Sequence, residues 1–275
     1  MISCKEYTEK RKQKLKEKVI TFKGQPCLAV IQIGDDTASN SYIKGKRRDC
    51  EECGVKFKHF HIKEYDNVSE DELICIIKAL NEDKVVDGII IQLPIPDKYN
   101  VEEIQKHILP EKDVDGFRRD SCFEPCTPKG VIDWLKYNDY QFEGKTACVI
   151  GRSEIVGKPL AKMLIDLNCT VTLCHSKTDD LQLTNAVTCS DIVFSCIDKI
   201  EYFNKKPFND AQDIIDIGLG KGKDGKLHGN INKEYLEQLK KSKYNRILVS
   251  GIGNTGLLTR LALIENVIKA YELNN

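Results

Sequence analysis

Residues 151–159, Gly-Arg-Ser-Glu-Ile-Val-Gly-Lys-Pro, lie between two apolar runs, at residues 146–150 and 160–167. The first run is typical of a strand and the second of a helix, so the stretch between them predicts a βα turn. Glycines let backbone N–H groups approach a phosphate, and the positive end of the following helix favours an anion there. The stretch therefore predicts a nucleotide-binding turn. Ser153 replaces the middle glycine of the common G-x-G-x-x-G pattern, so an ordinary βα turn without a ligand stays open as the alternative.

Further apolar runs follow this turn toward the C-terminus. Short strands are expected at residues 146–150, 170–174, 192–196, 213–217 and 246–249, with helices or turns between them. Five strands with crossovers predict a doubly wound, Rossmann-like parallel sheet. We expect the helix at residues 258–271 to pack against the first half of the chain.

The first half repeats a β-α-β-α-β order. Runs that are apolar on both faces, such as Ile89-Ile90-Ile91, are typical of buried parallel strands. Strands are expected at residues 27–33, 56–62 and 88–92; helices are expected at residues 6–19, 38–53, 69–81, 101–107 and 126–137, the last with Thr127 as its N-cap. The predicted fold class is α/β, with two α/β domains flanking a cleft. The first spans residues 1–124 and is completed by the helix at 257–275, and the second spans residues 125–256.

Composition excludes several classes of partner. The 275 residues carry 42 basic and 42 acidic side chains, so the bulk charge favours neither nucleic acid nor a membrane surface. No apolar run approaches the roughly 20 residues that span a bilayer. The 12 cysteines are scattered through expected strands and helices, which is typical of reduced thiols in a cytoplasmic protein. Cys50-x-x-Cys53 lacks a second pair at zinc-site spacing, so no metal is expected.

The strand end after residue 174 indicates which dinucleotide binds. An NAD site has an acidic residue about 20 positions after the glycine turn, which holds the ribose hydroxyls. Here the strand ends in His175-Ser176-Lys177, and Arg152 stands in the glycine turn itself. A guanidinium and a hydroxyl suit a 2′-phosphate, so NADP is the predicted cofactor. Solvated surface charges are the alternative interpretation of Arg152 and Lys177.

Candidate catalytic residues lie in the first domain. Tyr42 and Lys46 are one helical turn apart, which places a phenol and an ammonium on one patch, although a solvated helix face has the same spacing. Gln92 ends a buried strand, at the edge where parallel sheets bind ligands. Asp113 and Asp115 lie in a turn, where aspartates are also common for structural reasons.

Five motifs follow one another along the chain: Ala-Ser-Asn-Ser-Tyr-Ile-Lys-Gly-Lys at 38–46, Asp-Gly-Ile-Ile-Ile-Gln-Leu-Pro-Ile-Pro at 87–96, Lys-Asp-Val-Asp-Gly-Phe at 112–117, Pro-Cys-Thr-Pro at 125–128 and residues 151–159. In this order the motifs resemble the methylenetetrahydrofolate dehydrogenase/methenyltetrahydrofolate cyclohydrolase family over nearly the whole chain. Cys-His-Ser-Lys-Thr at 174–178 and Asp-Ile-Gly-Leu at 216–219 extend the match.

The resemblance implies a bifunctional enzyme. It would oxidise 5,10-methylenetetrahydrofolate with NADP to the methenyl cation and hydrolyse that cation to 10-formyltetrahydrofolate, as a homodimer. In the family, the lysine matching Lys46 is the key group of the cyclohydrolase step. Tyr42 would orient the folate, Gln92 would hold Lys46 by a hydrogen bond, and Asp115 would bind the pterin. The positions that match cofactor-binding residues are Gly151, Arg152, Ser153, Ser176 and Leu219.

The chain departs from the family pattern at two places near the expected cofactor. Residues 252–259 read Ile-Gly-Asn-Thr-Gly-Leu-Leu-Thr, where the family has a segment with prolines, Pro-Gly-Gly-Val-Gly-Pro-Met-Thr. Cys-Ile-Asp-Lys at 196–199 replaces a Val-Gly-Lys-Pro turn. These departures motivate an alternative hypothesis, a catalytically weak paralogue that binds folate or nucleotide. A short-chain dehydrogenase using Tyr42 and Lys46 is disfavoured, because its glycine turn would precede that pair.

Overall fold

The chain forms two compact units, which are named here by their sheets. The structure, a computed structural model, describes residues 2–65, 67–204, 208, 212–222, 225–241 and 247–275. The three-stranded unit comprises Glu6–Cys126 and Arg260–Asn275, and the five-stranded unit comprises Met1–Lys5 and Thr127–Thr259.

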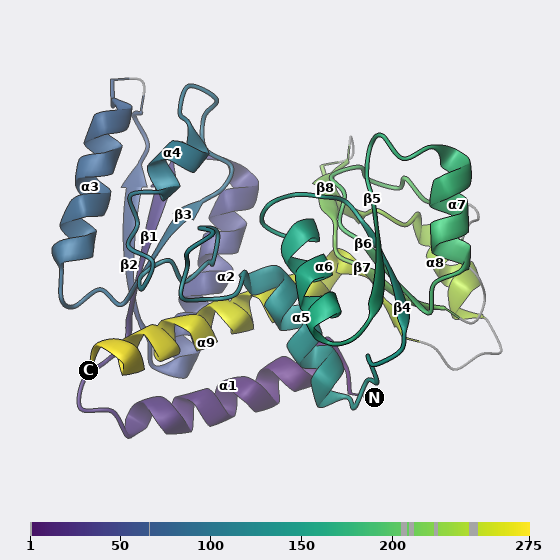
Figure 1. The fold of residues 1–275 in the computed structure, drawn as a ribbon. Coiled ribbons are helices and arrows are strands. Elements are labelled where there is room, and N and C mark those ends of the chain that lie inside the picture. Colours follow the sequence, from purple (N-terminus) through teal and green to yellow (C-terminus); the bar gives the residue numbers. More distant parts are fainter. Residues whose placement is uncertain (1, 66, 205–207, 209–211, 223–224, 242–246) are drawn as a thin grey trace. The chain divides into compact units, whose positions relative to one another are not determined.

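The three-stranded unit contains a parallel sheet in the order β2-β1-β3 (Figure 1). The strands are β1 (Cys27–Ile33), β2 (Lys56–Ile62) and β3 (Gly88–Gln92), as predicted. The helices are α1 (Cys4–Ile20), α2 (Thr37–Cys53), α3 (Glu70–Glu82), α4 (Val101–Gln105) and α9 (Gly256–Asn274). The predicted β-α-β-α-β order is therefore confirmed, and Ser69 and Glu72 form a capping box at the start of α3.

Alternate residues of β1 point to opposite faces of this sheet, as the period of a strand requires. Ala29 and Ile31 pack with α3, whose Leu73 and Ile77 are one turn apart and buried. Gln32 points to the other face, toward α2, because it donates to an α2 side chain. α1 and α9 lie side by side within this unit (Figure 1) and are joined by the ion pairs Arg11–Glu265 at 2.5 Å and Lys18–Glu272 at 2.6 Å.

The five-stranded unit has the predicted doubly wound parallel sheet, in the order β10-β7-β6-β4-β5. Its strands are β4 (Thr146–Ile150), β5 (Thr170–Cys174), β6 (Ile192–Ser195), β7 (Asp213–Asp216) and β10 (Leu248–Val249). Its helices are α5 (Cys126–Tyr137), α6 (Gly157–Asp166), α7 (Asp180–Thr188) and α8 (Lys233–Lys240). Arg246, the first residue of the last predicted strand, lies outside the described residues.

One face of the five-stranded sheet carries a hydrophobic core. This core is formed by alternate residues of β4, β6 and β7 with α7 and α8, including Cys148, Val193, Ile214 and Leu239.

An antiparallel hairpin of β8 (Leu219–Lys221) and β9 (Leu227–Gly229) was not predicted. Its strands are only three residues long, too short for an alternating pattern to be recognised.

Two helix starts differ from expectation. α5 already includes Cys126, so Thr127 lies inside the helix, where its hydroxyl pairs with that of Thr259 at 3.2 Å. Residues 251–255 form a π-helical turn that runs directly into α9. This segment has no proline, so its backbone N–H groups remain donors, and Thr255 adds a side-chain bond to Gly251 O at 3.2 Å.

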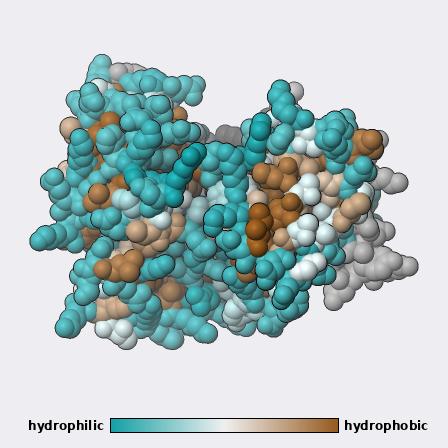
Figure 2. Space-filling view, in the orientation of Figure 1, coloured by the Kyte–Doolittle hydropathy of each residue, from teal (hydrophilic) through white to brown (hydrophobic). Residues whose placement is uncertain are grey.

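The visible surface is mostly hydrophilic, with separate apolar patches, one of them in the region of α6 (Figure 2). On α6, Ile165 is 58% exposed, an ordinary occurrence for a single apolar residue. None of the helices in the described ranges combines the length and apolar character that crossing a membrane requires.

Truncating Leu73 tests the core beneath α3. Leu73 is 1% exposed, and Leu73→Ala should lower the free energy of unfolding by about 2–5 kcal/mol, because it removes buried methyl groups and leaves a cavity. Lys78→Ala, on the exposed side of the same helix, is the matched control and should change it by less than about 0.5 kcal/mol. Urea denaturation measures both. Equal effects in the two variants would contradict this assignment of the core.

Candidate functional site

Lys46 and Gln92 form a buried polar pair in the three-stranded unit. Each side chain belongs to a residue that is 8% exposed, and Lys46 Nζ donates to Gln92 Oε1 at 3.1 Å. Gln92 ends β3, and its Nε2 donates to Leu93 O at 2.7 Å, so its amide oxygen is directed at the lysine. The hydrogen bond that the family resemblance implied is therefore present, at the carboxyl edge of the sheet. The roles of both residues stay predictions.

Lys46 is placed by the way α2 is held. Asp36 caps the start of α2 by accepting from Ser39 N, and Gly54 ends it. One turn beyond Lys46, the buried Asp49 carboxylate accepts from Lys12 Nζ at 3.1 Å and from Arg260 Nε at 2.5 Å. These bonds tie α2 to α1 and α9. The three residues are far apart in sequence, so no local pattern could have identified Asp49.

Tyr42 lies one turn before Lys46 on α2 and is half-buried. This spacing places both side chains on one side of the helix. Because Lys46 is buried while Tyr42 is partly open to solvent, the interpretation of the pair as a fully solvated helix face is wrong for Lys46.

The turn that carries Asp115 is held in place by Lys112. This lysine is 7% exposed, and its Nζ donates to three carbonyl oxygens near the end of α3, those of Leu80, Asn81 and Asp83, at 3.1, 2.8 and 2.9 Å. Carbonyl oxygens at a helix end lack intrahelical partners, so a cation there is favourable. Burial nevertheless lowers the pKa of Lys112.

Asn266 on α9 holds the same turn from the other side. Its Nδ2 donates to Val114 O at 2.9 Å and to Glu124 O at 3.1 Å, and Asn266 is 2% exposed. Gly116 has φ +72, and a Cβ there would lie 2.7 Å from the backbone carbon of Glu124, so only glycine fits. Asp115 thus sits on a rigid backbone.

The structure separates the two aspartates of this turn. Asp113 is 3% exposed, and its Oδ2 accepts from Arg118 N at 2.9 Å, so its carboxylate is used inside the turn. Burial raises the pKa of Asp113. Asp115 is half-buried and therefore the one open to a ligand. The sequence had left both possibilities open.

In the five-stranded unit, the glycine turn leads from β4 into α6. Gly151 has φ +119, and a Cβ there would lie 2.6 Å from Cys196 O, so only glycine permits this turn. The N-cap position of α6 is Val156, which cannot bond to the helix start through its side chain. Ser153 supplies that bond instead, because its Oγ accepts from Gly157 N at 3.3 Å. The start of α6 and its N–H groups thus face this turn, as in nucleotide sites.

Arg152 and Ser176 leave the sheet from neighbouring strands. Ile150 and Cys174 are register partners at the ends of β4 and β5, and the two residues follow them by two positions each. Both are exposed, at the edge where parallel sheets bind ligands. Leu219, the fifth predicted cofactor residue, opens β8 shortly after β7 and is half-buried.

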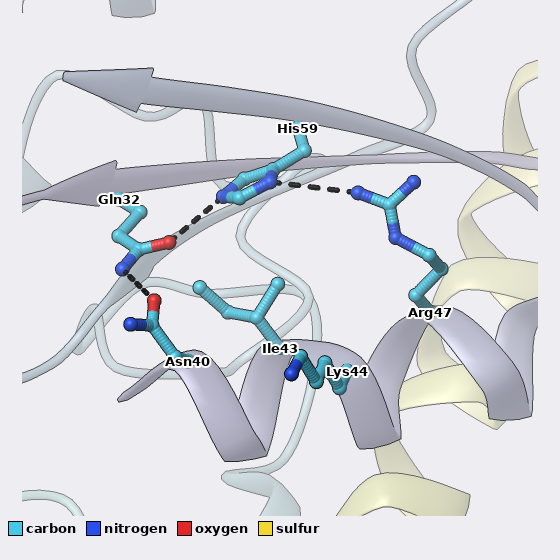
Figure 3. A pocket seen from close by; sticks show the side chains of 6 residues that line it. All are labelled: Gln32, Asn40, Ile43, Lys44, Arg47 and His59. Atoms are coloured by element: carbon cyan, nitrogen blue, oxygen red, sulfur yellow. Dashed lines mark hydrogen bonds between the residues drawn. The ribbon is translucent and has the colours of Figure 1, made fainter. Parts of the chain in front are cut away.

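A cavity of about 310 Å³ is lined by side chains of α2, β1 and β2, and none of the predicted site residues lines it (Figure 3). Four of its polar side chains bond to one another. Arg47 donates to His59 Nδ1 at 3.5 Å, which makes His59 Nε2 the donor to Gln32 Oε1 at 2.9 Å, and Gln32 Nε2 donates to Asn40 Oδ1 at 2.8 Å. This series of hydrogen bonds links β2, β1 and α2. It requires a neutral His59, because Nδ1 accepts a hydrogen bond while Nε2 donates one.

Two family models match the chain. Residues 2–115 match "Tetrahydrofolate dehydrogenase/cyclohydrolase, catalytic domain", and residues 125–275 match "Tetrahydrofolate dehydrogenase/cyclohydrolase, NAD(P)-binding domain". Together they include every predicted site residue.

Individual relatives agree with the family models. The chain is 38% identical to "Bifunctional protein FolD" of Campylobacter jejuni (strain RM1221) over 98% of this chain and 97% of the relative. A crystal structure of the bifunctional enzyme FolD from Campylobacter jejuni covers 99% of this chain and 98% of its own, with a TM-score of 0.90 and 36% identity. The Trypanosoma brucei FolD structure, complexed with NADP cofactor and inhibitor, covers 99% and 97%, with a TM-score of 0.89 and 25% identity.

The neutral state of His59 predicts a pH dependence of stability. Burial, and then the neighbouring His61 and Arg47, lower the pKa of His59, so the unfolded chain binds a proton more readily. The stability contributed by neutral His59 is therefore present above the unfolded pKa, about 6.5, and is lost as the pH falls through and below it.

His59→Gln should flatten the slope of the free energy of unfolding against pH between about pH 7 and 5. His107→Gln, outside this cluster, is the control and should keep the wild-type slope. Denaturant titrations at several pH values measure the slopes. An unchanged slope in His59→Gln would contradict the neutral state of this histidine.

Proposed function

Because this chain belongs to the tetrahydrofolate dehydrogenase/cyclohydrolase family, we propose that it oxidises 5,10-methylenetetrahydrofolate with NADP and hydrolyses the methenyl product to 10-formyltetrahydrofolate. The observation that carries this proposal is the buried hydrogen bond from Lys46 Nζ to Gln92 Oε1 at the carboxyl edge of the three-stranded sheet. An ammonium or amine kept in a fixed position and shielded from water suits proton transfer to a bound substrate.

We assign the folate to the three-stranded unit. Tyr42, half-buried beside Lys46, would orient the folate, and Asp115 would bind the pterin amino edge through its carboxylate. The support for Asp115 is its partial exposure on a backbone that Lys112 and Asn266 hold rigid. A fixed acceptor loses little freedom on binding, so it orients the substrate at low entropic cost.

Lys46 would serve the cyclohydrolase step. Water adds to the carbon of the methenyl cation and releases a proton. When the resulting ring opens, the departing nitrogen gains a proton and the carbinol hydroxyl loses its proton as the formyl C=O forms, so that one proton is released overall. Lys46 Nζ can accept the first proton and deliver the second, while Gln92 keeps it in position. Gln92 bonds to Lys46 only through its amide oxygen, because its Nε2 is engaged with Leu93 O.

NADP would bind at the carboxyl edge of the five-stranded sheet, where it accepts a hydride from the methylene carbon. Gly151 and Ser153 fit a pyrophosphate, because the turn is compact and leads into the start of α6. Arg152 and Ser176 leave neighbouring strands and are both exposed, which suits a 2′-phosphate. Leu219 would contact the cofactor through its apolar side chain. Oxidation needs no protein base, since the folate nitrogen lone pair stabilises the cation.

We further propose a homodimer in the cytoplasm, with tetrahydrofolate derivatives as the small-molecule partners. The homodimer rests on the family resemblance, and light scattering should give twice the chain mass of 31.2 kDa. The cytoplasmic location is supported by cysteines scattered through regular elements, many of them buried, which is typical of proteins kept reduced.

Replacing Lys46 tests the proposed activity. Purified wild-type protein should convert methylenetetrahydrofolate and NADP to the methenyl compound and NADPH, and then to the formyl product. Lys46→Met should slow hydrolysis of methenyltetrahydrofolate by about 10²-fold or more, the usual contribution of a general acid–base group.

Lys44→Met, exposed on the same helix, is the matched control and should keep the wild-type rate. Loss of methenyl absorbance measures hydrolysis. If wild-type protein forms no methenyl product with NADP or NAD, the proposed function is wrong; if Lys46→Met hydrolyses at the wild-type rate, only the role of Lys46 is wrong.

Replacing Arg152 tests the choice of cofactor. Arg152→Ala should raise the KM for NADP about tenfold, because it removes a charge-assisted contact to the 2′-phosphate. The KM for NAD, which has no such phosphate, should change little. Lys158→Ala, on the first turn of α6, is the control for a general loss of positive charge. Equal losses with NADP and NAD would contradict the assignment of Arg152.

A further inference from the structure

The five-stranded sheet has a topological switch point between β4 and β6. From β4 the chain passes to β5 on one side and then crosses to β6 on the other, so the crevice for a ligand lies outside the carboxyl ends of β4 and β6. Gly151 follows β4 and Cys196 follows β6. They are in close contact, since a Cβ on Gly151 would lie 2.6 Å from Cys196 O.

Residues 196–199 therefore form the β6 side of this crevice. Cys196 still bonds to the sheet, because its N donates to Ile150 O at 2.8 Å. From Ile197 to Lys199 three backbone groups instead bond to a single side chain, that of Asn230, which comes just after β9.

Asn230 is 0% exposed, and its carboxamide is used on both sides. The Oδ1 atom accepts from Ser195 Oγ at 2.8 Å and from Ile197 N at 3.2 Å. The Nδ2 atom donates to Ile197 O and to Lys199 O, each at 2.8 Å. Every hydrogen-bonding direction of the amide is thus occupied, and the loop from 197 to 199 is fixed at both of its ends.

Asn230 is itself fixed by Asp216 at the end of β7. Asp216 Oδ1 accepts from Asn230 N at 3.1 Å, and Oδ2 accepts from Ile231 N at 3.2 Å. Burial raises the pKa of the Asp216 carboxyl to about 7. Gly218 permits this packing, because a Cβ there would lie 2.1 Å from Ile197 O. These contacts therefore connect the ends of β6, β7 and β9 next to the crevice. The residues that form this cluster are Ser195, Asp216, Gly218 and Asn230.

We propose that Asn230 is a positioning residue for the nucleotide cofactor, which holds residues 197–199 in the conformation that closes the β6 side of the binding crevice. This inference rests on the proposed use of a nicotinamide dinucleotide. Asn230 does not need to contact the cofactor. It acts through the loop backbone, while the side chains of Asp198 and Lys199 remain exposed to solvent.

The chemistry of the amide explains why another residue of the same shape cannot replace it. A carboxylate at this position has no N–H to donate, so the carbonyl groups of Ile197 and Lys199 would lose their partner and face a negative oxygen. It would also stand next to the Asp216 carboxyl. A buried polar group without a partner is costly, so the loop would move away.

The test compares Asn230→Asp with wild type in two measurements on the full-length protein. NADPH binding, followed by its fluorescence, should weaken about tenfold, the size expected when the bonds that hold the loop are lost. Hydrolysis of methenyltetrahydrofolate added without cofactor should keep its wild-type rate, because Lys46 lies in the other unit. Ser195→Ala, which removes one bond to the same amide, should weaken NADPH binding less.

Asn232→Asp is the matched control. Asn232 caps α8 by accepting from Glu234 N and Tyr235 N, and an aspartate caps equally well, so NADPH binding should not change. Wild-type NADPH affinity in Asn230→Asp would overturn the proposal. Joint loss of hydrolysis and NADPH binding, in both Asn230→Asp and Ser195→Ala, would also overturn it, because Asn230 would then serve the whole fold. Failure of wild type to bind NADPH would instead contradict the proposed function.

Discussion

Parallel strands that are buried on both faces constrain the rest of this structure. Such strands must be joined by crossovers that return the chain to the same end of the sheet, so every strand delivers its last residue to one edge. Three strands end in polar residues at that edge: Gln92 ends β3, Ser195 ends β6 and Asp216 ends β7. A buried polar side chain earlier in a strand needs a partner from another element, as Gln32 of β1 has in Asn40 of α2, whereas at the edge loops can supply the partner.

The same constraint explains how much of the fold could be predicted from the sequence. Short runs typical of strands, bounded by glycine, proline or charged residues, predicted β1, β2, β3, β4 and β5 to the residue. Their order along the chain implied parallel sheets, because alternating strands and helices leave few other topologies. The β8–β9 hairpin was missed because each strand has only three residues. The π-helical turn before α9 was missed because local patterns do not distinguish it from a loop.

The candidate site could be predicted only where one short segment carries the signal. Lys46 and Gln92 were identified because each stands in a distinctive local setting, a helical turn after Tyr42 and the end of an apolar strand. The residues that hold them were not. Asp49 bonds to Arg260, which is 211 positions away in the sequence, and Asn266 bonds to Val114, which is 152 positions away. Local periodicity carries no information about contacts at such separations. Such residues can be identified only from the folded structure, in which they are in contact.

Burial divides the polar residues of both units into two groups with different energetic consequences. Asp49, Lys112, Asn230 and Asn266 are each 7% exposed or less and have bonds on several sides. Removing one leaves buried groups unpaired, so stability and geometry change together. Asp115, Arg152 and Ser176 are half-buried or exposed, so their replacement would remove the proposed ligand contacts with little effect on folding. Lys46 belongs to both groups, since it is buried yet bonded to Gln92 alone among the contacts described. A buried lysine with a single neutral partner keeps hydrogen-bonding capacity that the fold does not use, and in the proposed function the folate substrate would use it.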